Sequence, residues 1–434
     1  MGDGGSASRR ARRAGAVIAA ALAGVVLLAG AANALLLLAH QWAGPADRRM
    51  GDLRVYWVAV GALRGGHDLY DAATPNGLQF TYPPLAALLL APMRLASLTV
   101  VERTWLVLVL LTALAIPLLV IRRYPAAAAP RGALLFGMVA FVASYAVRGG
   151  LHWGQVSAFL TALVVLDALY LPRRWQGVGT GVAAAFRITP ALLAVVALLA
   201  RRVRFAVVAA GFAAGLTAVA AAVLPAESLR YWTDLLWRTG RVGQLDSPGN
   251  QSLIGVLTRW GVPAPAVGLV WFAVLACGTA LVVRYGRREQ ADRPHLLRLL
   301  TAGGLLAEVL APISWVHHWV WLPLTALLLY LDRRYVPAAA VAVLASLPVR
   351  TAYNETERLP VLPEALLTLT VVTALAAIVL LLRTPAPTAP AVGSGSRVPA
   401  QRAAPPGLDA GGTDVETRGR DPLVREPERP DLDG

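Results

Sequence analysis

The sequence predicts an all-α polytopic membrane protein, and three observations support that fold class. Hydrophobic residues make up 57% of the 434-residue chain, whereas charged residues make up only 15%. The mean hydropathy is +0.58. Runs of leucine, alanine and valine recur along the chain and are too long for barrel strands, so they indicate helices that satisfy their own backbone hydrogen bonds in lipid. We therefore expect about 10–13 transmembrane or half-membrane helices.

The net charge of +15 does not call for a nucleic-acid partner. All 40 basic residues are arginines, and they cluster at the ends of the apolar runs. Arginines in such positions are typical of the cytoplasmic ends of membrane helices, so the lipid bilayer is the expected partner. The single cysteine, Cys277, lies inside an apolar run, which excludes a disulfide framework and a cysteine-based metal site.

The first predicted element is a helix over residues 14–38. The preceding residues 1–13 carry four arginines, so this end is expected to stay in the cytoplasm as a basic N-terminus. The apolar run is too long for a signal peptide and lacks a convincing cleavage site. Residues 40–82 are then expected to form an outer loop.

Further arginine clusters orient the remaining runs. They predict crossings over residues 104–121, 131–148, 156–171, 203–224, 266–284, 294–312, 316–331, 336–350 and 365–382. Residues 226–262 become a second outer loop, in which Leu229, Trp232 and Leu236 indicate a helix lying in the interface. Residues 14–382 would form one transmembrane catalytic domain. Residues 383–434, rich in Pro, Ala, Gly and Arg, are expected to form a disordered cytoplasmic tail.

Two apolar stretches do not fit a full crossing. Residues 83–98 would begin and end outside, and residues 178–200 would begin and end inside. Pro92 and Arg94 interrupt the first stretch, and Arg187 and Pro190 interrupt the second. Broken helices are tolerated at membrane depth where they face protein or a polar cavity, so we interpret both as hairpins that line a site. Alternatively, each is one or two ordinary crossings.

Asp52, in the first outer loop, is the strongest candidate for chemistry. Ionisable groups at a membrane face are costly to keep there and are functional candidates by default. Transfer of a sugar from a phosphate leaving group needs one base, because the phosphate departs as a stable anion, whereas glycoside hydrolysis uses two carboxyl groups. Tyr56 and Trp57 follow within the same segment and offer aromatic faces on which a sugar could stack. Alternatively, Asp52 is a solvated residue that caps a short surface helix.

His317 and His318 follow Pro312 and lie among tryptophans. Adjacent histidines point to different sides of a helix, so one of them is expected to face a cavity. A metal site would need ligands about one helical turn apart, so we expect no metal ion. The alternative is an aromatic belt at the membrane interface.

Arg187 is a lone cation in an apolar stretch, and its guanidinium matches the geometry of a donor phosphate. The alternative is an arginine that snorkels to the membrane surface. Gln155, Asn250 and Gln251 lie at predicted outer ends, where they could hydrogen-bond sugar hydroxyls or cap helices. The sequence has no glycine-rich phosphate loop, so a nucleotide-driven pump is not supported.

In this order, these segments resemble the polyprenol-phosphate-mannose-dependent mannosyltransferases, which form glycosyltransferase family 87 of the GT-C fold. The resemblance rests on residues 52–56 (DLRVY), 66–70 (GHDLY), 81–84 (TYPP), 154–155 (GQ), 186–190 (FRITP), 250–252 (NQS) and 312–318 (PISWVHH). The likeness covers roughly residues 14–382, and the family is best known from actinobacterial phosphatidylinositol mannoside synthesis.

The resemblance implies an enzyme of the bacterial plasma membrane whose active site faces the extracytoplasmic side. It would move mannose from a polyprenyl-phosphate donor to a glycolipid or cell-envelope glycan, by an inverting single displacement. Asp52 corresponds to the family's base, and lysine often stands where this chain has Arg187. No cofactor is expected. The residues expected to bind the substrates are Tyr56, Tyr82, Gln155, Arg187, Asn250, Gln251, His317 and His318.

Two rival interpretations stay open, a flippase or transporter for a lipid-linked sugar and a GT-C transferase that uses another sugar. A flippase has no need for a carboxylate base in an outer loop. It would also more often show repeated broken segments, and residues 83–98 and 178–200 share no evident similarity. A non-catalytic scaffold would leave the polar segments unexplained.

Overall fold

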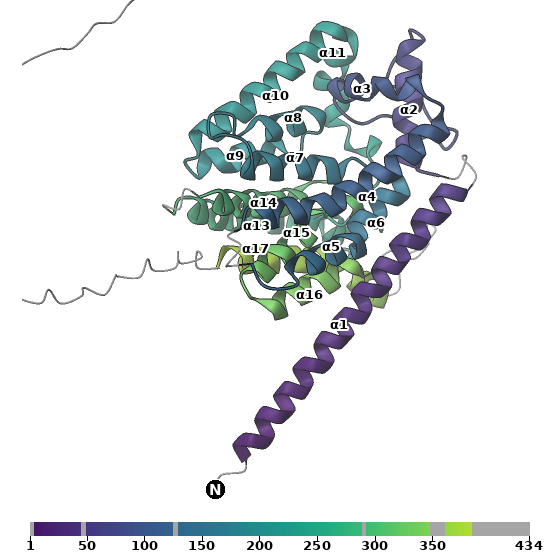
Figure 1. The fold of residues 1–434 in the computed structure, drawn as a ribbon. Coiled ribbons are helices and arrows are strands. Elements are labelled where there is room, and N and C mark those ends of the chain that lie inside the picture. The colour runs from purple at the N-terminus through teal and green to yellow at the C-terminus, as the bar shows by residue number, and fades with distance from the viewer. Residues whose placement is uncertain (1–3, 45–48, 125–128, 289–291, 348–360, 384–434) are drawn as a thin grey trace, which may run out of the picture. The chain divides into compact units, whose positions relative to one another are not determined.

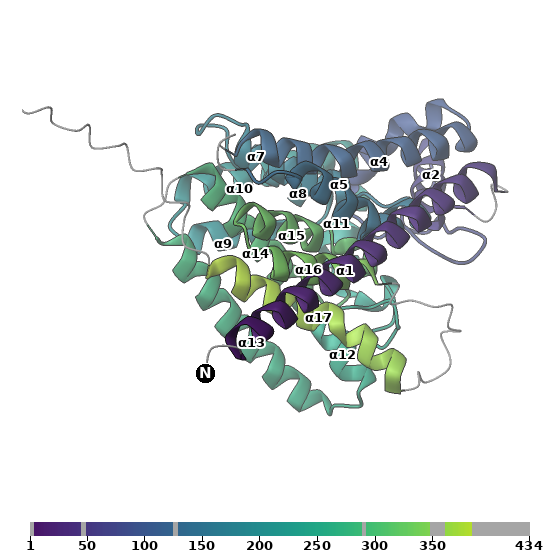
Figure 2. The same cartoon turned by 60° about the horizontal axis from the view of Figure 1, so that its bottom comes forward.

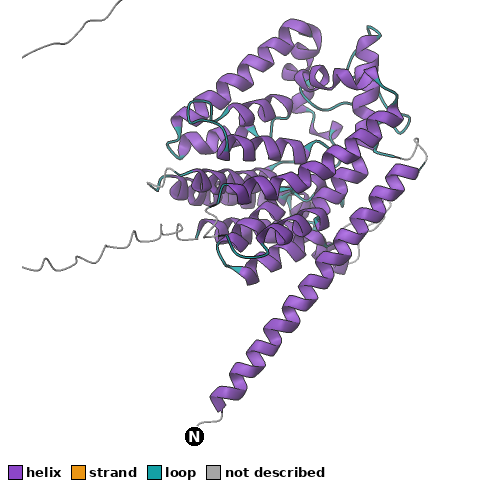
Figure 3. Ribbon diagram, viewed as in Figure 1, coloured by secondary structure: helices purple, strands orange, loops and turns teal. Residues whose placement is uncertain are grey.

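The prediction of an all-α fold is confirmed. The computed structural model describes residues 4–44, 49–124, 129–288, 292–347 and 361–383, which form helices joined by loops without any strand (Figure 3). Residues 1–3 of the predicted basic N-terminus and most of the predicted tail, residues 384–434, lie outside the described residues, whereas residues 4–13 form the start of the first helix. Their predicted roles therefore stay predictions.

The helices follow one another along the chain and are coloured in that order in Figure 1. They are α1 (Gly4–Ala43), α2 (Gly51–Arg64), α3 (Pro84–Leu90), α4 (Leu98–Arg122), α5 (Ala133–Ala143), α6 (Tyr145–Trp153), α7 (Ser157–Leu169), α8 (Val178–Phe186), α9 (Ala191–Leu199), α10 (Val203–Val223), α11 (Pro225–Thr233), α12 (Leu253–Arg259), α13 (Ala264–Gly286), α14 (Arg293–Leu310), α15 (Trp321–Leu331), α16 (Tyr335–Ser346) and α17 (Val361–Leu382). Short 3₁₀ turns are η2 (Ala91–Leu95), η3 (Leu235–Trp237), η4 (Thr239–Arg241) and η5 (Val316–His318).

Five described helices are long and apolar enough to cross a membrane, within α1, α4, α10, α13 and α17. The α5–α6 pair, bent by 49°, makes a sixth if it is counted as one span. The arginine clusters predicted ten full crossings, so several of the predicted crossings contain helices that are shorter than expected. Helix α7 ends before Pro172, which cannot continue a helix, and an irregular segment precedes α15. Arginines mark the ends of apolar runs, but they do not set how much of each run is helical.

Both stretches predicted as hairpins are interrupted helices, whereas their place in a membrane stays a prediction. Helix α3 passes into η2, which contains Pro92 and Arg94. Helix α8 ends at Phe186, and Arg187 has extended backbone angles (φ −148°, ψ 133°). Pro190 disfavours a helical conformation at the residue before it and lacks the N–H that would continue α8. The break therefore follows from the local sequence.

Helix α1 packs against α5, α6 and α16. Helix α17 packs against α12, α13 and α14, and Figure 2 shows it beside α12 and α13. The second outer loop contains α11, a short helix where an interfacial one was predicted. The first outer loop is held by its own buried cluster, in which Leu53, Tyr70 and Phe80 are fully buried against α6 and α8 residues such as Leu151 and Phe186. A loop packed in this way can hold a functional side chain in a fixed position.

Candidate active site

One cavity of about 490 Å³ gathers most of the predicted site residues. Its walls come from α2, the loop before α3, the turn between α6 and α7, the α8–α9 break, the second outer loop and the segment around η5. The predicted site residues that line it are Asp52, Tyr56, Tyr82, Gln155, Arg187, His317 and His318.

Asp52 lies in the first turn of α2, where the helix dipole favours a carboxylate. Its Oδ2 accepts a hydrogen bond of 2.5 Å from Gln155 Nε2. The Gln155 Oε1 accepts a bond of 3.0 Å from the Tyr82 hydroxyl, which in turn accepts one of 3.2 Å from the Tyr56 hydroxyl. This chain of hydrogen bonds fixes the carboxylate, while its Oδ1 accepts no hydrogen bond from the residues that the structure describes.

Gly154 explains how Gln155 reaches Asp52. This glycine ends α6 with a φ of 73°, a conformation that residues with a Cβ rarely adopt. A Cβ at this position would lie 2.5 Å from the Leu53 Cβ. The absence of a side chain therefore lets the end of α6 approach the first turn of α2.

Burial raises the pKa of Asp52 to about 6, and the hydrogen bond from Gln155 opposes this rise by stabilising the carboxylate. A base is most efficient when its pKa lies near the working pH, because it is then both deprotonated and basic. The half-buried Asp52 carboxylate can accept a proton from a group bound in the cavity.

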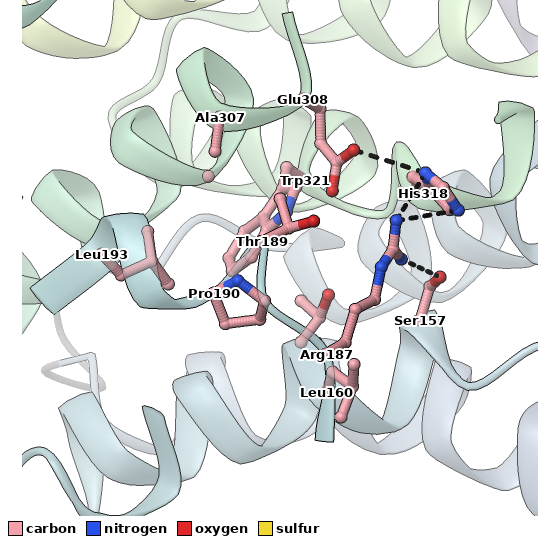
Figure 4. A pocket seen from close by; sticks show the side chains of 12 residues that line it. Ser157, Leu160, Arg187, Thr189, Pro190, Leu193, Ala307, Glu308, His318 and Trp321 are labelled. Carbon is pink, nitrogen blue, oxygen red and sulfur yellow. Dashed lines mark hydrogen bonds and ion pairs between the residues drawn. The ribbon is translucent and has the colours of Figure 1, made fainter. Parts of the chain in front are cut away.

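Arg187 reaches the cavity from the α8–α9 break, and Figure 4 shows it pointing toward His318 and Ser157. Its Nη2 lies 2.7 Å from His318 Nδ1 and 2.9 Å from His318 Nε2, and its Nη1 lies 3.5 Å from Ser157 Oγ. Because these partners lie inside the protein, the side chain does not snorkel to the surface. The arrangement can hold an anion beside the guanidinium.

The two histidines have different surroundings. His318 Nδ1 accepts a hydrogen bond of 3.1 Å from the Trp315 backbone N–H, so its ring is fixed as well as close to Arg187. His317 is buried, and neither of its ring nitrogens has a hydrogen-bond partner among the described residues. Since both residues line the cavity, His317 has free polar atoms for a ligand, whereas His318 supports Arg187.

Glu308 belongs to this region although the sequence reasoning did not single it out. Its Oε2 accepts a 2.8 Å hydrogen bond from Ser314 Oγ and lies 3.4 Å from His318 Nδ1. Its side chain lines a small pocket behind Arg187 (Figure 4). A lone carboxylate within the predicted crossing at residues 294–312 was the signal that could have found it.

Asn250 and Gln251 do not line the cavity, and both are fully buried. Asn250 Nδ2 donates to the Pro312 carbonyl at 3.0 Å, and its Oδ1 accepts from the Ser314 N–H at 3.0 Å. The Gln251 backbone N–H donates to the Ser314 carbonyl at 2.7 Å. The two residues therefore join the second outer loop to the segment that carries the histidines.

Two further lining residues escaped the sequence reasoning, Arg241 and Tyr231, both from the second outer loop. Neither stood out, because arginines and aromatic residues are common throughout this chain.

No group of three or more His, Cys, Asp or Glu side chains suited to a metal ion occurs within the described ranges.

Candidate membrane spans together with a cavity that holds a carboxylate, a guanidinium and two histidines fit a multi-pass membrane enzyme. The chain belongs to glycosyltransferase family 87, whose profile matches residues 80–312. Asp52 and the two histidines lie outside the matched range, so their roles depend on the geometry described above.

Curated relatives agree with this assignment. The chain is 32% identical over 315 residues, 70% of this chain and 72% of the relative, to the polyprenol-phosphate-mannose-dependent alpha-(1-2)-phosphatidylinositol pentamannoside mannosyltransferase of Mycobacterium tuberculosis (strain CDC 1551 / Oshkosh). It is also 32% identical to the polyprenol-phosphate-mannose-dependent alpha-(1-2)-phosphatidylinositol mannoside mannosyltransferase of Mycolicibacterium smegmatis, over 65% of this chain and 71% of that relative. No solved structure matches the chain.

Proposed function

We propose that this glycosyltransferase moves mannose from a polyprenyl-phosphate donor to a glycolipid acceptor at the outer face of the plasma membrane. The relatives are named for that donor and for phosphatidylinositol mannoside acceptors. The observation that carries the proposal is that Asp52 and Arg187 line one cavity, and that Asp52 is the only carboxylate in its lining among the described residues. One base and one phosphate-binding cation suit transfer from a phosphate, whereas hydrolysis of a glycoside uses two carboxyl groups.

In the proposed reaction, Asp52 takes the proton of an acceptor hydroxyl while that oxygen attacks the anomeric carbon of mannose. The bond between the anomeric carbon and the phosphate oxygen breaks, and its electron pair leaves with the polyprenyl phosphate. Arg187 stabilises the departing phosphate with charge-assisted hydrogen bonds. Because attack and departure take place on opposite sides of one carbon, the displacement inverts its configuration.

The outer face is supported by the charge pattern. The arginines at residues 9–13 favour a cytoplasmic N-terminus, so the first crossing would bring α2 to the outer side. The cavity is lined by residues of both predicted outer loops, among them Asp52, Tyr82 and Tyr231.

The test is transfer of radiolabelled mannose from polyprenyl phosphate to lipids, in membranes that contain wild-type protein, Asp52→Asn or Asp71→Asn. Asp71 is a matched control, because it lies in the same outer loop but pairs with Arg230 at the surface. We expect wild type and Asp71→Asn to form labelled glycolipid and Asp52→Asn, at equal protein level, to form none. Equal labelling by Asp52→Asn would exclude Asp52 as the base, and no labelling by any protein would exclude this donor.

A further inference from the structure

Arg241 is a second cation of the cavity, and the mechanism above leaves it unused. It is the last residue of η4 in the second outer loop and lines the same cavity as Asp52 and Arg187. The side chain is half-buried, so its charge is only partly exposed to bulk solvent.

The contacts of Arg241 leave its charge without a carboxylate partner. Its Nη2 donates to the Tyr70 carbonyl at 3.1 Å and lies 3.3 Å from Gln79 Oε1, and both acceptors are neutral. Arg241 forms no ion pair within the part of the chain that the structure describes, and its Nε and Nη1 donate to none of those residues. The guanidinium carbon lies 5.8 Å from the centre of the neutral Tyr70 ring, so three N–H groups and a positive charge without a counter-ion lie at the cavity wall.

Other arginines of this loop are neutralised. Arg230 pairs with Asp68 at 2.8 Å and with Asp71 at 2.6 Å, and Arg238 pairs with Asp234 at 2.6 Å. Arg241 thus differs from its neighbours both in facing the cavity and in lacking a counter-charge. A half-buried cation without a partner is unfavourable unless a ligand supplies the negative charge.

The two arginines of the cavity have separate surroundings. Arg187 lies between His318 and Ser157, whereas Arg241 lies beside Tyr70 and Gln79. A polyprenyl-phosphate-mannose donor carries one phosphodiester, which the proposed mechanism assigns to Arg187. A second guanidinium in the same cavity fits a second phosphodiester, which the acceptor would bring.

We propose that Arg241 binds the phosphodiester of the acceptor lipid and thereby selects acceptors that carry such a group over neutral glycolipids and free glycans. This inference rests on the proposed function. Tyr231 lines the same cavity, and its ring stacks on that of the buried Tyr70 at 5.7 Å, so Tyr231 offers aromatic surface to the acceptor headgroup.

The test uses the full-length protein in detergent and varies donor and acceptor concentrations separately. Arg241→Gln keeps a hydrogen-bond donor for the Tyr70 carbonyl but removes the charge, and Arg241→Lys keeps the charge. Arg238→Gln is the matched control, because it removes a neighbouring arginine that pairs at the surface. We expect Arg241→Gln to raise the acceptor KM about 10-fold or more, the scale of a lost hydrogen bond to a charged group, with the donor KM unchanged.

Arg241→Lys should recover part of that affinity, and Arg238→Gln should behave as wild type. A second arm compares a phosphatidyl-linked acceptor with the same glycan on diacylglycerol, which we expect only wild type to discriminate strongly. A rise in the donor KM alone would assign Arg241 to the donor phosphate and overturn the inference. A lower kcat with both KM values unchanged would also overturn it. If wild-type protein transfers no mannose to any acceptor, the proposed function fails, whereas transfer without discrimination defeats this inference alone.

Discussion

At the scale of the residue, the environment of Asp52 determines the pH at which it can act. Its pKa of about 6 results from burial, opposed by the hydrogen bond from Gln155. Because only the carboxylate accepts a proton, kcat/KM, which reports the groups of the free enzyme, should fall as the pH drops through about 6. Gln155→Leu removes the bond that stabilises the carboxylate, so the pKa rises and the acidic limb of the pH–rate profile shifts to higher pH. A pH–rate profile of both proteins measures this shift.

Tyr56→Phe is the control for that experiment, because it removes only the far hydroxyl of the chain and leaves the Gln155–Asp52 bond in place. Its acidic limb should coincide with that of wild type. A limb that stays in place or moves to lower pH in Gln155→Leu would contradict the role of Gln155.

Residue patterns revealed part of this site. Asp52, Arg187 and the two histidines stood out because each is a polar group in an apolar context, and the structure brings them to one cavity. The same patterns could not distinguish Gln155, which lines the cavity, from Asn250, which hydrogen-bonds to the Pro312 carbonyl outside the cavity lining. Both are amides at predicted loop positions, and only the tertiary fold decides which atoms their side chains face.

At the scale of the element, the junction of α6 with α2 depends on Gly154. Any larger residue there meets two penalties, the positive φ and a 2.5 Å contact with the Leu53 Cβ. We expect Gly154→Ala to displace α6 from α2, break the Gln155–Asp52 bond and reduce mannosyl transfer by about 10-fold or more, the scale of a misplaced catalytic group. The rate of transfer at equal protein level measures this effect.

Gly261→Ala is the matched control for the junction. Gly261 has a similar φ of 72°, but nothing lies within 4 Å of a Cβ built there. It should therefore show only the backbone penalty of about 1 kcal/mol in stability and retain transfer activity. Equal loss of activity in both variants would mean that backbone strain, and not the α6–α2 contact, explains the effect.

Helix number illustrates the limit of sequence reasoning at this scale. The arginine clusters correctly indicated a helical membrane protein, and Pro190 correctly indicated the break that releases Arg187. The lengths of α7, α15 and α16 could not be predicted from the sequence, because an apolar run can end in a turn whose backbone hydrogen bonds are satisfied by neighbouring segments.

At the scale of the whole molecule, buried ion pairs join the site to the helices around it. Arg49, three residues before Asp52, pairs with Glu102 at the start of α4 at 2.8 Å, and both side chains are almost fully buried. Arg49 Nη1 also donates to the Gln41 carbonyl at the end of α1. This arginine therefore connects α1, α4 and the segment that leads into α2.

Glu102→Leu should lower the stability of the protein by about 3–5 kcal/mol, because it leaves Arg49 buried without a counter-charge. The double variant Arg49→Met with Glu102→Leu should be more stable than the single variant, since it removes the unpaired charge as well. Asp71→Asn, which breaks the exposed pair with Arg230, should change the unfolding midpoint little, because solvent screens that interaction. Thermal unfolding in detergent measures all three. If the double variant were no more stable than Glu102→Leu, the loss of stability would come from side-chain packing. The ion pair would then not be what holds the segment from Arg49 to Asp52 against α1 and α4.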